Sequence, residues 1–303
     1  MIKKVLIIGG TGFLGFHTAK LFVKKKFRVI SLSRSKPKKL RLIKNIKYVF
    51  CDISNKKKLF NILKKIKKIN FVINFGGEVE HKRVSKVLSS HYNGLVNLAN
   101  FFKDKSLTKF VQIGSSLEYG KSSSPQNEKS KLNPKSNYSK AKMKSSKYLL
   151  NLYKKNDFPV IILRPYQIYG PYQDLNRFIP ITIIGCLENK KFKCSDGRQF
   201  RDFIFIEDFV NYLYLLLVKQ NIKGEIFNIG FGKPIKIKNI INLIRKQIKM
   251  GAPQFGKIKL RKEENLITYP NVSKLQRYTK TKPKVNFVKG LKKTIKFYKE
   301  NKI

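Results

Sequence analysis

The sequence predicts an α/β protein built on a doubly wound parallel sheet, and three observations point to this fold class. An apolar segment at residues 5–8 runs through a glycine-rich turn into an amphipathic helix. Short apolar segments and helical segments then alternate as far as residue 164. The chain has 303 residues, 42% of them hydrophobic, which is enough to bury a large core in one or two domains.

The first element is the segment VLIIGGTGFLG at residues 5–15, in which three glycines follow a strand at intervals of three. Gly9 permits the tight turn out of the strand, Gly12 lets backbone amides approach a pyrophosphate, and Gly15 lets the helix pack closely on the sheet. The N-terminus of that helix favours negative charge. The strand before the glycines and the amphipathic helix after them favour a dinucleotide site over an ordinary glycine-rich turn.

The second strand, at residues 28–33, ends where such a fold contacts the adenosine ribose. An acidic residue at this point binds the ribose 2′-hydroxyl of NAD, whereas an arginine beside a small hydroxyl suits the 2′-phosphate of NADP. The chain has Ser33 and Arg34 here. NADP is therefore slightly favoured over NAD, the alternative being that Arg34 is one of many solvated basic residues.

The alternation of strands and helices continues in order through the first half of the chain. Strands are expected at residues 48–51, 71–75, 110–114 and 160–164, and helices at residues 84–103 and 136–155. Because the carboxyl ends of parallel strands share one edge of a sheet, the loops after these strands are expected to meet there. Gly76 and Gly77 follow one of these strands, where small residues let a cofactor lie close to the backbone.

After residue 164 the alternation breaks at YQIYGPYQ, which is rich in aromatic residues and turn formers. Helices are expected at residues 178–190, 209–218 and 235–248, and strands within 194–205 and at 225–230. We therefore predict a cofactor-binding domain at residues 1–168 and a smaller mixed α+β substrate lobe at residues 169–303. Segments near residues 203–230 are expected to return to the first domain.

The chain is strongly basic, with 67 Lys and Arg against 17 Asp and Glu, a formal charge of +50. Such a charge is compatible with nucleic-acid or anionic-membrane binding. Lysines are spread over nearly every expected helix, however, with no basic tail and no RNA-binding aromatic motif, so specific nucleic-acid binding is disfavoured. The three cysteines form no metal-binding or disulfide pattern, so no metal is expected. No segment reads as a signal peptide or a membrane span, so a soluble cytoplasmic protein is expected.

Tyr138 and Lys142, in YSKAK, lie four residues apart at the start of a helix and project from one face. Tyrosine is a poor base at its usual pKa of about 10, but a neighbouring ammonium and a cationic nicotinamide both favour the phenolate. Ser115, at the end of the fifth strand, faces the same edge. Alone, the tyrosine and lysine would indicate surface packing. Together with the glycine loop and the serine, they indicate a group that removes a proton from a sugar hydroxyl.

These motifs, GGTGFLG, VINFGG, IGSSLEYG, YSKAK and LRPYQIYGP in this order, resemble the extended short-chain dehydrogenase/reductase family with its Rossmann domain. The likeness is to the NAD(P)-dependent nucleotide-sugar epimerases and dehydratases, and RDFIFIEDF, FNIGFGKPI and YPNVSKLQ extend it over nearly the whole chain. The resemblance implies that Ser115, Tyr138 and Lys142 are catalytic. It implies cofactor contacts from Gly9, Gly12, Phe13, Leu14, Gly15, Ser33, Arg34, Asp52, Ile53, Phe75, Gly76, Gly77, His91, Tyr138, Lys142 and Pro165. It implies substrate contacts from Ser115, Gln167, Arg201, Arg261 and Glu264.

The chain departs from the family pattern at three places. His91 stands where a helix of the family usually offers an asparagine, and Asn93 is displaced by two residues. Family dehydratases follow the catalytic hydroxyl with an Asp-Glu pair that eliminates water, and this chain has Ser116 and Leu117 instead. Glu118 is offset by one residue, so dehydration is disfavoured. Gln167 replaces the more usual asparagine.

Three functions follow as hypotheses. The first is an epimerase acting at C4 of a nucleotide-diphosphate sugar, similar to the UDP-glucose 4-epimerases. The second is an NADPH-dependent reductase of a nucleotide-linked 4-keto-6-deoxy sugar, favoured by Ser33 and Arg34; a 4,6-dehydratase ranks below both. A non-catalytic protein associated with nucleotides or nucleic acid is the third. The resemblance also implies a homodimer formed through the helices at residues 84–103 and 136–155.

Overall fold

The computed structural model describes residues 2–77, 87–260 and 264–301. These residues form two compact units. Unit 1 comprises Met1–Gly120, Lys131–Pro165 and Val210–Phe227, and unit 2 comprises Lys121–Ser130, Tyr166–Phe209 and Asn228–Ile303. The sequence predicted one boundary near residue 168, and the contacts between residues place that division between Pro165 and Tyr166. The segment Val210–Phe227 belongs to unit 1.

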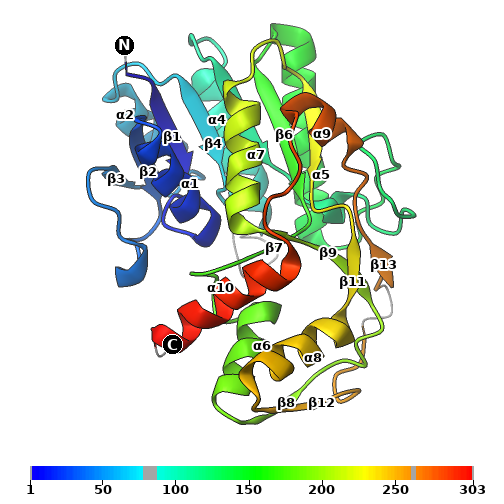
Figure 1. Cartoon of the computed structure of the whole chain (residues 1–303). Helices are drawn as coiled ribbons and strands as arrows, with labels where there is room; N and C mark the ends of the chain where they lie inside the picture. The colour runs from blue at the N-terminus through cyan, green and yellow to red at the C-terminus, as the bar shows by residue number, and fades with distance from the viewer. Residues whose placement is uncertain (1, 78–86, 261–263, 302–303) are drawn as a thin grey trace. The chain divides into compact units, whose positions relative to one another are not determined.

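Unit 1 is built on a seven-stranded sheet of order β10-β6-β5-β4-β1-β2-β3 (Figure 1). The five neighbouring pairs from β6 to β3 are all parallel, which confirms the predicted doubly wound α/β fold. The register places Val5 opposite Val29 on one side and Phe71 on the other. The strands are β1 (Lys4–Ile8), β2 (Arg28–Ser33), β3 (Lys47–Phe50), β4 (Phe71–Asn74), β5 (Lys109–Ile113), β6 (Val160–Pro165) and β10 (Glu225–Ile229).

Helices cover both faces of this sheet because its central strands are apolar on both sides. Leu6 and Ile8 belong to the core cluster that packs on α2, α4 and α5. Alternate residues of a strand point to opposite faces, and on the other face Phe22 of α1 contacts Tyr214 of α7 with ring centroids 5.8 Å apart. The helices are α1 (Phe13–Lys24), α2 (Lys56–Lys64), α4 (Gly94–Phe102), α5 (Asn137–Asn156) and α7 (Ile206–Val218). The first turn of α7, residues 206–209, belongs to unit 2.

A buried lysine connects the sheet to one of these helices. The Nζ atom of Lys109, at the start of β5, donates to the carbonyl oxygen of Leu216 at 3.1 Å and to that of Lys219. These carbonyls lie at the C-terminal end of α7, where the helix dipole favours a cation. Burial and the nearby charge of Lys219 lower the pKa of Lys109 to about 8. Lys109 therefore caps α7 from inside the protein.

Unit 2 contains two small sheets and four helices among its described residues. Strand β9 (Phe200–Phe205) pairs in parallel with β7 (Gln167–Tyr169) and β13 (Ile267–Thr268), and antiparallel with β11 (Pro234–Lys236). A second pair joins β8 (Lys191–Lys193) to β12 (Ala252–Gln254). The helices are α6 (Phe178–Leu187), α8 (Ile237–Ile248), α9 (Ser273–Thr279) and α10 (Phe287–Glu300).

Two buried carboxylates hold the loops of unit 2 together. The carboxylate of Asp202 accepts hydrogen bonds from the backbone N–H groups of Phe231, Gly232 and Lys233 at 2.6–3.0 Å. The carboxylate of Asp208 accepts from the N–H groups of Lys284 and Val285. Asp202 therefore connects segments about 30 residues apart, and Asp208 connects segments 76 residues apart. Both satisfy backbone amides that would otherwise lose hydrogen bonds on burial.

The predicted elements match the structure with small differences at their ends. The predicted helix at 178–190 ends at Leu187, and the one predicted at 209–218 begins earlier, at Ile206. The predicted helix at 84–103 lies partly outside the described residues, and its described part contains a π-helical turn. Over the described ranges, no helix combines the length and apolar character needed to cross a bilayer, and the three cysteines are buried and free.

Candidate active site

A cavity of about 210 Å³ opens at the carboxyl ends of β1, β2 and β4 in unit 1. Nine of the residues predicted to contact a cofactor line it: Gly9, Gly12, Ser33, Arg34, Asp52, Ile53, Phe75, Gly76 and Gly77. Six further residues line the cavity without having been predicted as cofactor contacts: Ile8, Thr11, Leu32, Ser35, Cys51 and Ser90. Five of these six adjoin a predicted residue in the chain, so the strand-end rule could have found them. The sixth, Ser90, comes from the π-helical turn.

The glycine loop has the geometry of a phosphate cradle. Gly9 has φ +73°, the left-handed region that a residue with a side chain rarely adopts. A Cβ atom on Gly15 would lie 2.2 Å from the carbonyl oxygen of Gly9, so helix α1 approaches the loop too closely for any other residue. Gly12 precedes α1 as its N-cap and makes no side-chain cap. The first amides of the helix therefore lack a side-chain cap at Gly12, and the loop fits a dinucleotide pyrophosphate.

The residues at the ends of β2 and β3 stabilise the loops around this cavity. The Oγ atom of Ser33 accepts a hydrogen bond from the backbone N–H of Thr11 at 3.2 Å, which ties β2 to the glycine loop. The next residue, Arg34, is exposed and lines the cavity. Asp52 accepts from both the N–H and the hydroxyl of Ser54. The wall at β2 is therefore basic, and the wall at β3 carries a carboxylate.

The remaining predicted cofactor residues do not line this cavity. Phe13 is buried in the first turn of α1, with its ring edge-on to that of His17 at 5.4 Å. Leu14 and Gly15 follow in the same helix, and Pro165 ends β6. His91, Tyr138 and Lys142 form a separate group in unit 1.

Helix α5 carries this second group. Ser136 caps its N-terminus by accepting from the N–H of Ser139, so Tyr138 lies in the first turn. Lys142 lies one turn later on the same face, with Nζ 5.8 Å from the centre of the Tyr138 ring. The ammonium donates to the carbonyl oxygen of Ile113 at 2.7 Å. Because Ile113 ends β5 two residues before Ser115, this hydrogen bond fixes α5 beside the strand that carries the serine.

Burial changes the acidity of this lysine. Lys142 is only 3% exposed, and burial lowers its pKa to about 8, against the opposing effect of the negative charge of Glu118. A lysine with this pKa is largely protonated at neutral pH and loses its charge in mildly alkaline solution. The ammonium is therefore available beside the Tyr138 ring at neutral pH, where it favours the ionised form of a phenol.

His91 lies against the same tyrosine. Its ring is edge-on to that of Tyr138, with centroids 5.0 Å apart, and it lies in the π-helical turn Ser89–Asn93. A Cβ on Gly77 would lie 1.8 Å from the His91 ring, so the glycine is required for this packing. The hydroxyl of Ser145 donates to the His91 carbonyl at 2.8 Å. His91 thus occupies the space between the Gly77 loop and Tyr138, and π-helical turns often mark such sites.

The carboxylate next to Ser115 is turned into the protein. Glu118 accepts from the backbone N–H of Ser115 through Oε1 at 2.9 Å, and from Arg164 through Oε2 at 2.9 Å and 3.1 Å. The side chains of Glu118 and Arg164 are 0% and 2% exposed. At the two positions before it stand Ser116 and Leu117. The loop after Ser115 therefore presents no free carboxylate for an elimination reaction.

Unit 2 has a larger hollow of about 460 Å³, which brings together three of the predicted substrate residues: Gln167, Arg201 and Glu264. The Arg201 guanidinium and the Glu264 carboxylate form an ion pair at 2.5 Å, with 13% and 30% of the side chains exposed. Phe178, Phe192 and Phe203 give the hollow an apolar wall. Arg261, the fourth predicted residue of this group, lies outside the described residues. The hollow combines cations, an amide and aromatic rings, as a nucleotide site does.

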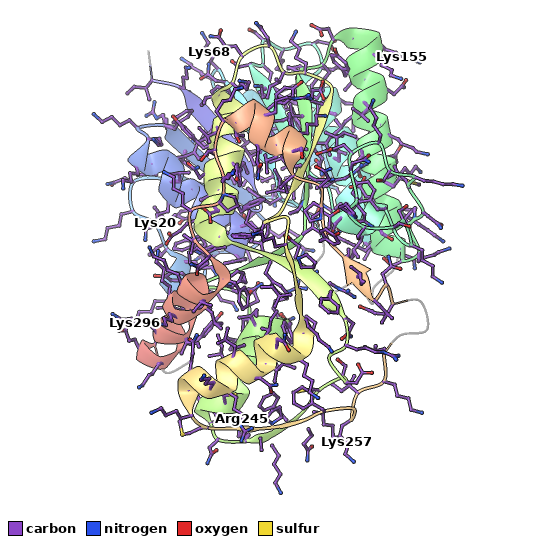
Figure 2. The ribbon with its side chains drawn as sticks, turned by 45° about the vertical axis from the view of Figure 1, so that its right-hand side comes forward. Lys20, Lys68, Lys155, Arg245, Lys257 and Lys296 are labelled. Carbon is purple, nitrogen blue, oxygen red and sulfur yellow. The ribbon has the colours of Figure 1, made fainter. Side chains whose placement is uncertain are left out.

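The basic residues of the chain are distributed over both units. Lys20, Lys68 and Lys155 of unit 1 and Arg245, Lys257 and Lys296 of unit 2 are all exposed and project from different elements (Figure 2). The charge is therefore not concentrated on one helix or one strand. This distribution agrees with diffuse attraction of polyanions.

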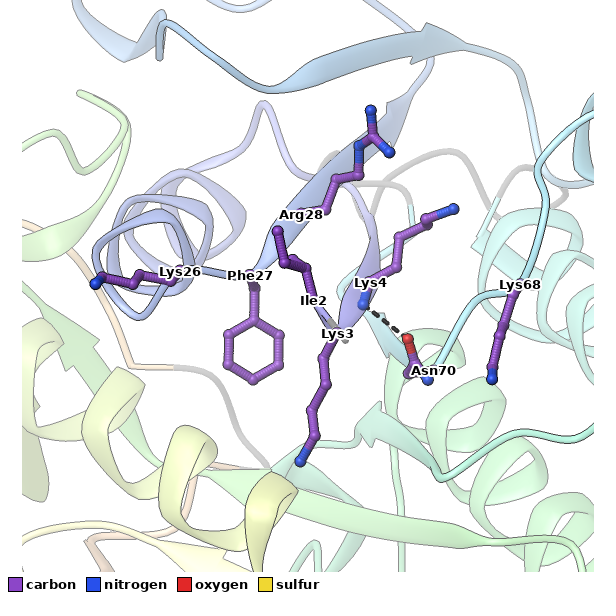
Figure 3. A pocket seen from close by; sticks show the side chains of 8 residues that line it. All are labelled: Ile2, Lys3, Lys4, Lys26, Phe27, Arg28, Lys68 and Asn70. Carbon is purple, nitrogen blue, oxygen red and sulfur yellow. Dashed lines mark hydrogen bonds between the residues drawn. The ribbon is translucent and has the colours of Figure 1, made fainter.

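A third cavity, of about 630 Å³, lies at the amino ends of β1, β2 and β4, opposite the edge with the glycine loop. Five basic residues line it: Lys3, Lys4, Lys26, Arg28 and Lys68. Figure 3 shows that their charged ends point in different directions. The backbone N–H of Lys4 donates to the side-chain oxygen of Asn70 at 2.8 Å. Cations that diverge do not surround a single bound anion. We therefore do not regard this cavity as a specific anion site.

Comparison with known proteins now identifies the group to which this site belongs. A family model described as the NAD dependent epimerase/dehydratase family matches residues 5–230, which include the glycine loop, Ser115, Tyr138 and Lys142. The chain belongs to this family. The predicted family resemblance is therefore confirmed, and the protein is an NAD(P)-dependent enzyme of the nucleotide-sugar epimerase and dehydratase class.

Relatives of this family enzyme include both dehydratases and epimerases. It is 26% identical to the dTDP-D-glucose 4,6-dehydratase of Mus musculus over 321 residues, which cover 99% of this chain and 89% of the relative. The UDP-glucose 4-epimerase of Thermotoga maritima has the same fold, with a TM-score of 0.92 at 21% identity and 99% and 100% of the chains covered. A UDP-glucuronic acid 4-epimerase from Bacillus cereus, solved with UDP-glucuronic acid and NAD, is 25% identical with a TM-score of 0.89, covering 98% and 99%.

Proposed function

We propose that this enzyme is an epimerase that inverts C4 of a nucleotide-diphosphate sugar, as UDP-glucose 4-epimerases do. The observation that carries the proposal is the orientation of Glu118, whose carboxylate is bound by Ser115 and Arg164 inside the protein. Elimination of water requires a proton donor and a proton acceptor beside the sugar. Inversion at C4 requires only that one hydroxyl be oxidised and the same carbon reduced again. Ser115, Tyr138 and Lys142 supply the proton-transfer groups for that chemistry, and a bound dinucleotide would carry the hydride.

In the proposed reaction, Tyr138 accepts the proton of the C4 hydroxyl, and Ser115 hydrogen-bonds the same oxygen. The ammonium of Lys142, 5.8 Å from the tyrosine ring, favours the phenolate that accepts this proton. A dinucleotide held by the glycine loop and the other residues of the unit 1 cavity would supply the hydride acceptor and donor for this inversion. Tyr138 gives its proton back to the C4 oxygen at that stage, so the protein ends each turnover in its starting state.

The unit 2 hollow is the proposed site of the nucleotide diphosphate. Arg201 is the proposed cation for the diphosphate, and its ion pair with Glu264 keeps the guanidinium in place before the substrate binds. Gln167 lines the same hollow and supplies an amide for hydrogen bonds. Arg261 is proposed as a further contact on the basis of its sequence alone. Aromatic residues on the other wall suit the flat face of a nucleobase.

For the cofactor, we propose NADP rather than NAD. This preference rests on Ser33 and Arg34, which end β2 and line the cavity of unit 1, where a 2′-phosphate needs a cation. The Bacillus cereus structure, in contrast, contains NAD. The test is to denature the purified protein and identify the released nucleotide by chromatography. Release of NAD alone, together with tighter binding of NAD than of NADP, would reverse this assignment.

A second candidate function is the reduction of a nucleotide-linked 4-keto-6-deoxy sugar with NADPH. The same Ser33 and Arg34 favour it, because net reductions commonly draw on NADPH. The two functions differ in stoichiometry, since epimerisation regenerates its cofactor in each turnover and reduction consumes one NADPH per product.

One panel of reactions separates these functions. The enzyme is incubated with UDP-glucose, UDP-galactose, UDP-glucuronic acid and their dTDP counterparts, without added reductant, and the sugars are resolved by chromatography. We expect interconversion of one C4 pair and no loss of water by mass spectrometry. A product lighter by one water would indicate a dehydratase, and stoichiometric NADPH oxidation with a 4-keto-6-deoxy sugar would indicate the reductase. Absence of interconversion for every sugar would reject the epimerase.

We also propose a homodimer formed through α4 and α5. These helices pack together in unit 1, where the hydroxyl of Tyr148 donates to Asn100 at 3.2 Å. Their solvent-facing sides would form the contact with the second copy. Light scattering at several protein concentrations tests the proposal, and a mass of one chain throughout would exclude it.

A further inference from the structure

The 3₁₀ turn after β5 contains a carboxylate that is fixed on all sides. Glu118 ends the turn Ser116–Glu118 and completes a capping box with Ser115. Its Oε1 accepts the Ser115 N–H, and its Oε2 accepts two N–H groups of Arg164 from β6. The Arg164 guanidinium in turn lies 4.8 Å from the centre of the Tyr119 ring. Each oxygen of Glu118 therefore has one defined partner group.

The surrounding backbone is shaped to admit this carboxylate. A Cβ on Gly114 would lie 2.5 Å from Glu118 Oε1 and 3.3 Å from the Arg164 side chain. A buried ion pair of this kind loses the solvation of both charges, and apolar residues of similar volume often stabilise a core equally well. The packing of the core therefore does not by itself explain why a charged pair is present here. Unlike apolar side chains, a charged and hydrogen-bonded pair fixes the orientation of the groups that it contacts.

The residue that Glu118 orients is Ser115. Its backbone N–H is held by Glu118, and its Oγ accepts from the N–H of Leu117 at 3.2 Å. Because the Oγ is the acceptor in that contact, its own hydrogen remains available for donation to another oxygen. Ser115 is 7% exposed, so its side chain is held within the protein at the end of β5. The contact with Leu117 thus fixes the position of the serine oxygen and leaves its hydrogen for a substrate oxygen.

Glu118 also acts on the lysine of the site. Lys142 faces the Tyr138 ring from its own helix and the Ile113 carbonyl from β5, and its ring partner Tyr138 also faces His91. Burial lowers the pKa of Lys142 to about 8, and the Glu118 charge opposes that fall. For Arg164, burial opposes the charged form, but Glu118 and Tyr119 outweigh it and raise its pKa. Arg164 therefore stays charged and Glu118 stays paired.

We infer that Glu118 is a positioning residue of this active site: anchored by Arg164, it holds the Ser115 backbone in place so that the serine hydroxyl points toward the reacting sugar oxygen. The inference rests on the proposed function, in which Ser115 donates to the C4 oxygen. It explains why a glutamate stands beside the catalytic serine without taking part in proton transfer. The same carboxylate also supports the positive charge of Lys142.

The first test compares Glu118→Gln with Asp208→Asn in the full-length enzyme with its cofactor bound. Glutamine has one acceptor oxygen, so it cannot serve both Ser115 and Arg164. Asp208 is a matched control, because it also loses a buried carboxylate bound to backbone amides but lies in unit 2. We expect kcat of Glu118→Gln to fall about 10- to 100-fold, with KM for the nucleotide sugar changing less than about threefold. Asp208→Asn should keep kcat.

The second test separates the backbone contact from the charge. Glu118→Gln/Arg164→Met removes the competing guanidinium, so the amide oxygen is again free to accept from Ser115. Glu118→Leu/Arg164→Met has similar packing but no acceptor. We expect the first double variant to recover much of the lost kcat and the second to stay low. Glu118→Gln alone, which keeps Arg164, should show the alkaline limb of the kcat profile at lower pH than the wild type, because Lys142 has lost a nearby negative charge. Equal kcat values for the two double variants would overturn the inference.

The third readout does not depend on turnover. Hydrogen exchange of the peptide 113–120, followed by mass spectrometry, reports on the Ser115 N–H. We expect faster exchange there in Glu118→Gln and Glu118→Leu/Arg164→Met, and unchanged exchange in Asp208→Asn. An inactive wild type would reject the proposed function while this measurement still reports on the Ser115 contact. Unchanged exchange, or a lowered melting temperature with wild-type kcat, would show that Glu118 has only a structural role.

Discussion

The two units of this enzyme position their candidate site residues in different ways. In unit 1 these residues lie at the carboxyl ends of consecutive parallel strands or in the first turns of the helices that follow. In unit 2, Gln167, Arg201 and Glu264 come from segments 34 and 63 residues apart, joined by the short strands β7, β9 and β13. A regular scaffold thus carries the proposed chemistry, and an irregular one carries the proposed substrate recognition. Variants of unit 1 should therefore change kcat, and variants of unit 2 should change KM.

The largest effect is expected for Tyr138→Phe in unit 1. Loss of the hydroxyl removes the group that accepts the proton, so kcat should fall by about 10³-fold while the cofactor stays bound. Steady-state kinetics and the nucleotide content of the purified protein measure these two properties.

Tyr148→Phe is the matched control, because Tyr148 lies on the same helix and its hydroxyl is bonded to Asn100. It should retain kcat within about twofold. Full activity of Tyr138→Phe would show that Tyr138 is not the proton acceptor, and the assignment of the chemistry to unit 1 would lose its main support.

In unit 2, Arg201→Met should raise KM for the nucleotide sugar about 10- to 100-fold, because one charge-assisted contact to the diphosphate is lost. Its kcat at saturating substrate should change much less. Arg198→Met is the control, since Arg198 also pairs with a carboxylate, that of Asp196, but is 63% exposed. If Arg201→Met lowered kcat and left KM unchanged, the assignment of recognition to unit 2 would be wrong.

The pH dependence of kcat should show an alkaline limb near the pKa of Lys142, about 8. Lys142 is charged below this pH and neutral above it, so support for the Tyr138 phenolate is lost as the pH rises. One unit above the pKa, about a tenth of the lysine is protonated, and kcat should be about tenfold lower.

Lys109 provides the control for this profile. Burial lowers its pKa to about 8 as well, but its ammonium caps α7 rather than facing the tyrosine. The alkaline limb should therefore persist in Lys109→Met. Disappearance of the limb in that variant would assign it to the stability of unit 1 instead of to the site.

The smallest effects concern the glycine loop of unit 1. Gly15→Ala places a Cβ 2.2 Å from the Gly9 carbonyl, so the free energy of unfolding should fall by about 1–3 kcal/mol. Gly12→Ala meets that carbonyl only at 3.3 Å and should affect stability little, while weakening cofactor binding. Thermal unfolding and cofactor titration of both variants test this difference. Equal losses of stability in the two variants would contradict the assignment of helix packing to Gly15 and of phosphate contact to Gly12.

The sequence by itself determined most of unit 1. Strands with period 2 and helices with period 3.6 are local patterns, and a buried parallel strand such as residues 28–33 is readable from its own residues. The glycine loop was readable for a similar reason, because a Cβ on Gly12 or Gly15 would meet the carbonyl of Gly9 a few residues away, and Gly9 itself has a positive φ. The candidate site in unit 2 came from family resemblance alone, since its strands have only two to six residues.

Tertiary structure decided what depends on partners distant in the sequence. Residues 121–130 belong to unit 2 because Gln126 bonds to Tyr269 and Asn228, more than 100 residues away. Glu118 turns into the protein because Arg164, 46 residues later, supplies the charge that makes its burial favourable. A local sequence pattern indicates on which face of its helix or strand a side chain lies. Whether a charged side chain turns inward depends on which distant group compensates for its desolvation. The fold class could therefore be predicted from the sequence, whereas the orientation of the reactive groups depends on tertiary packing.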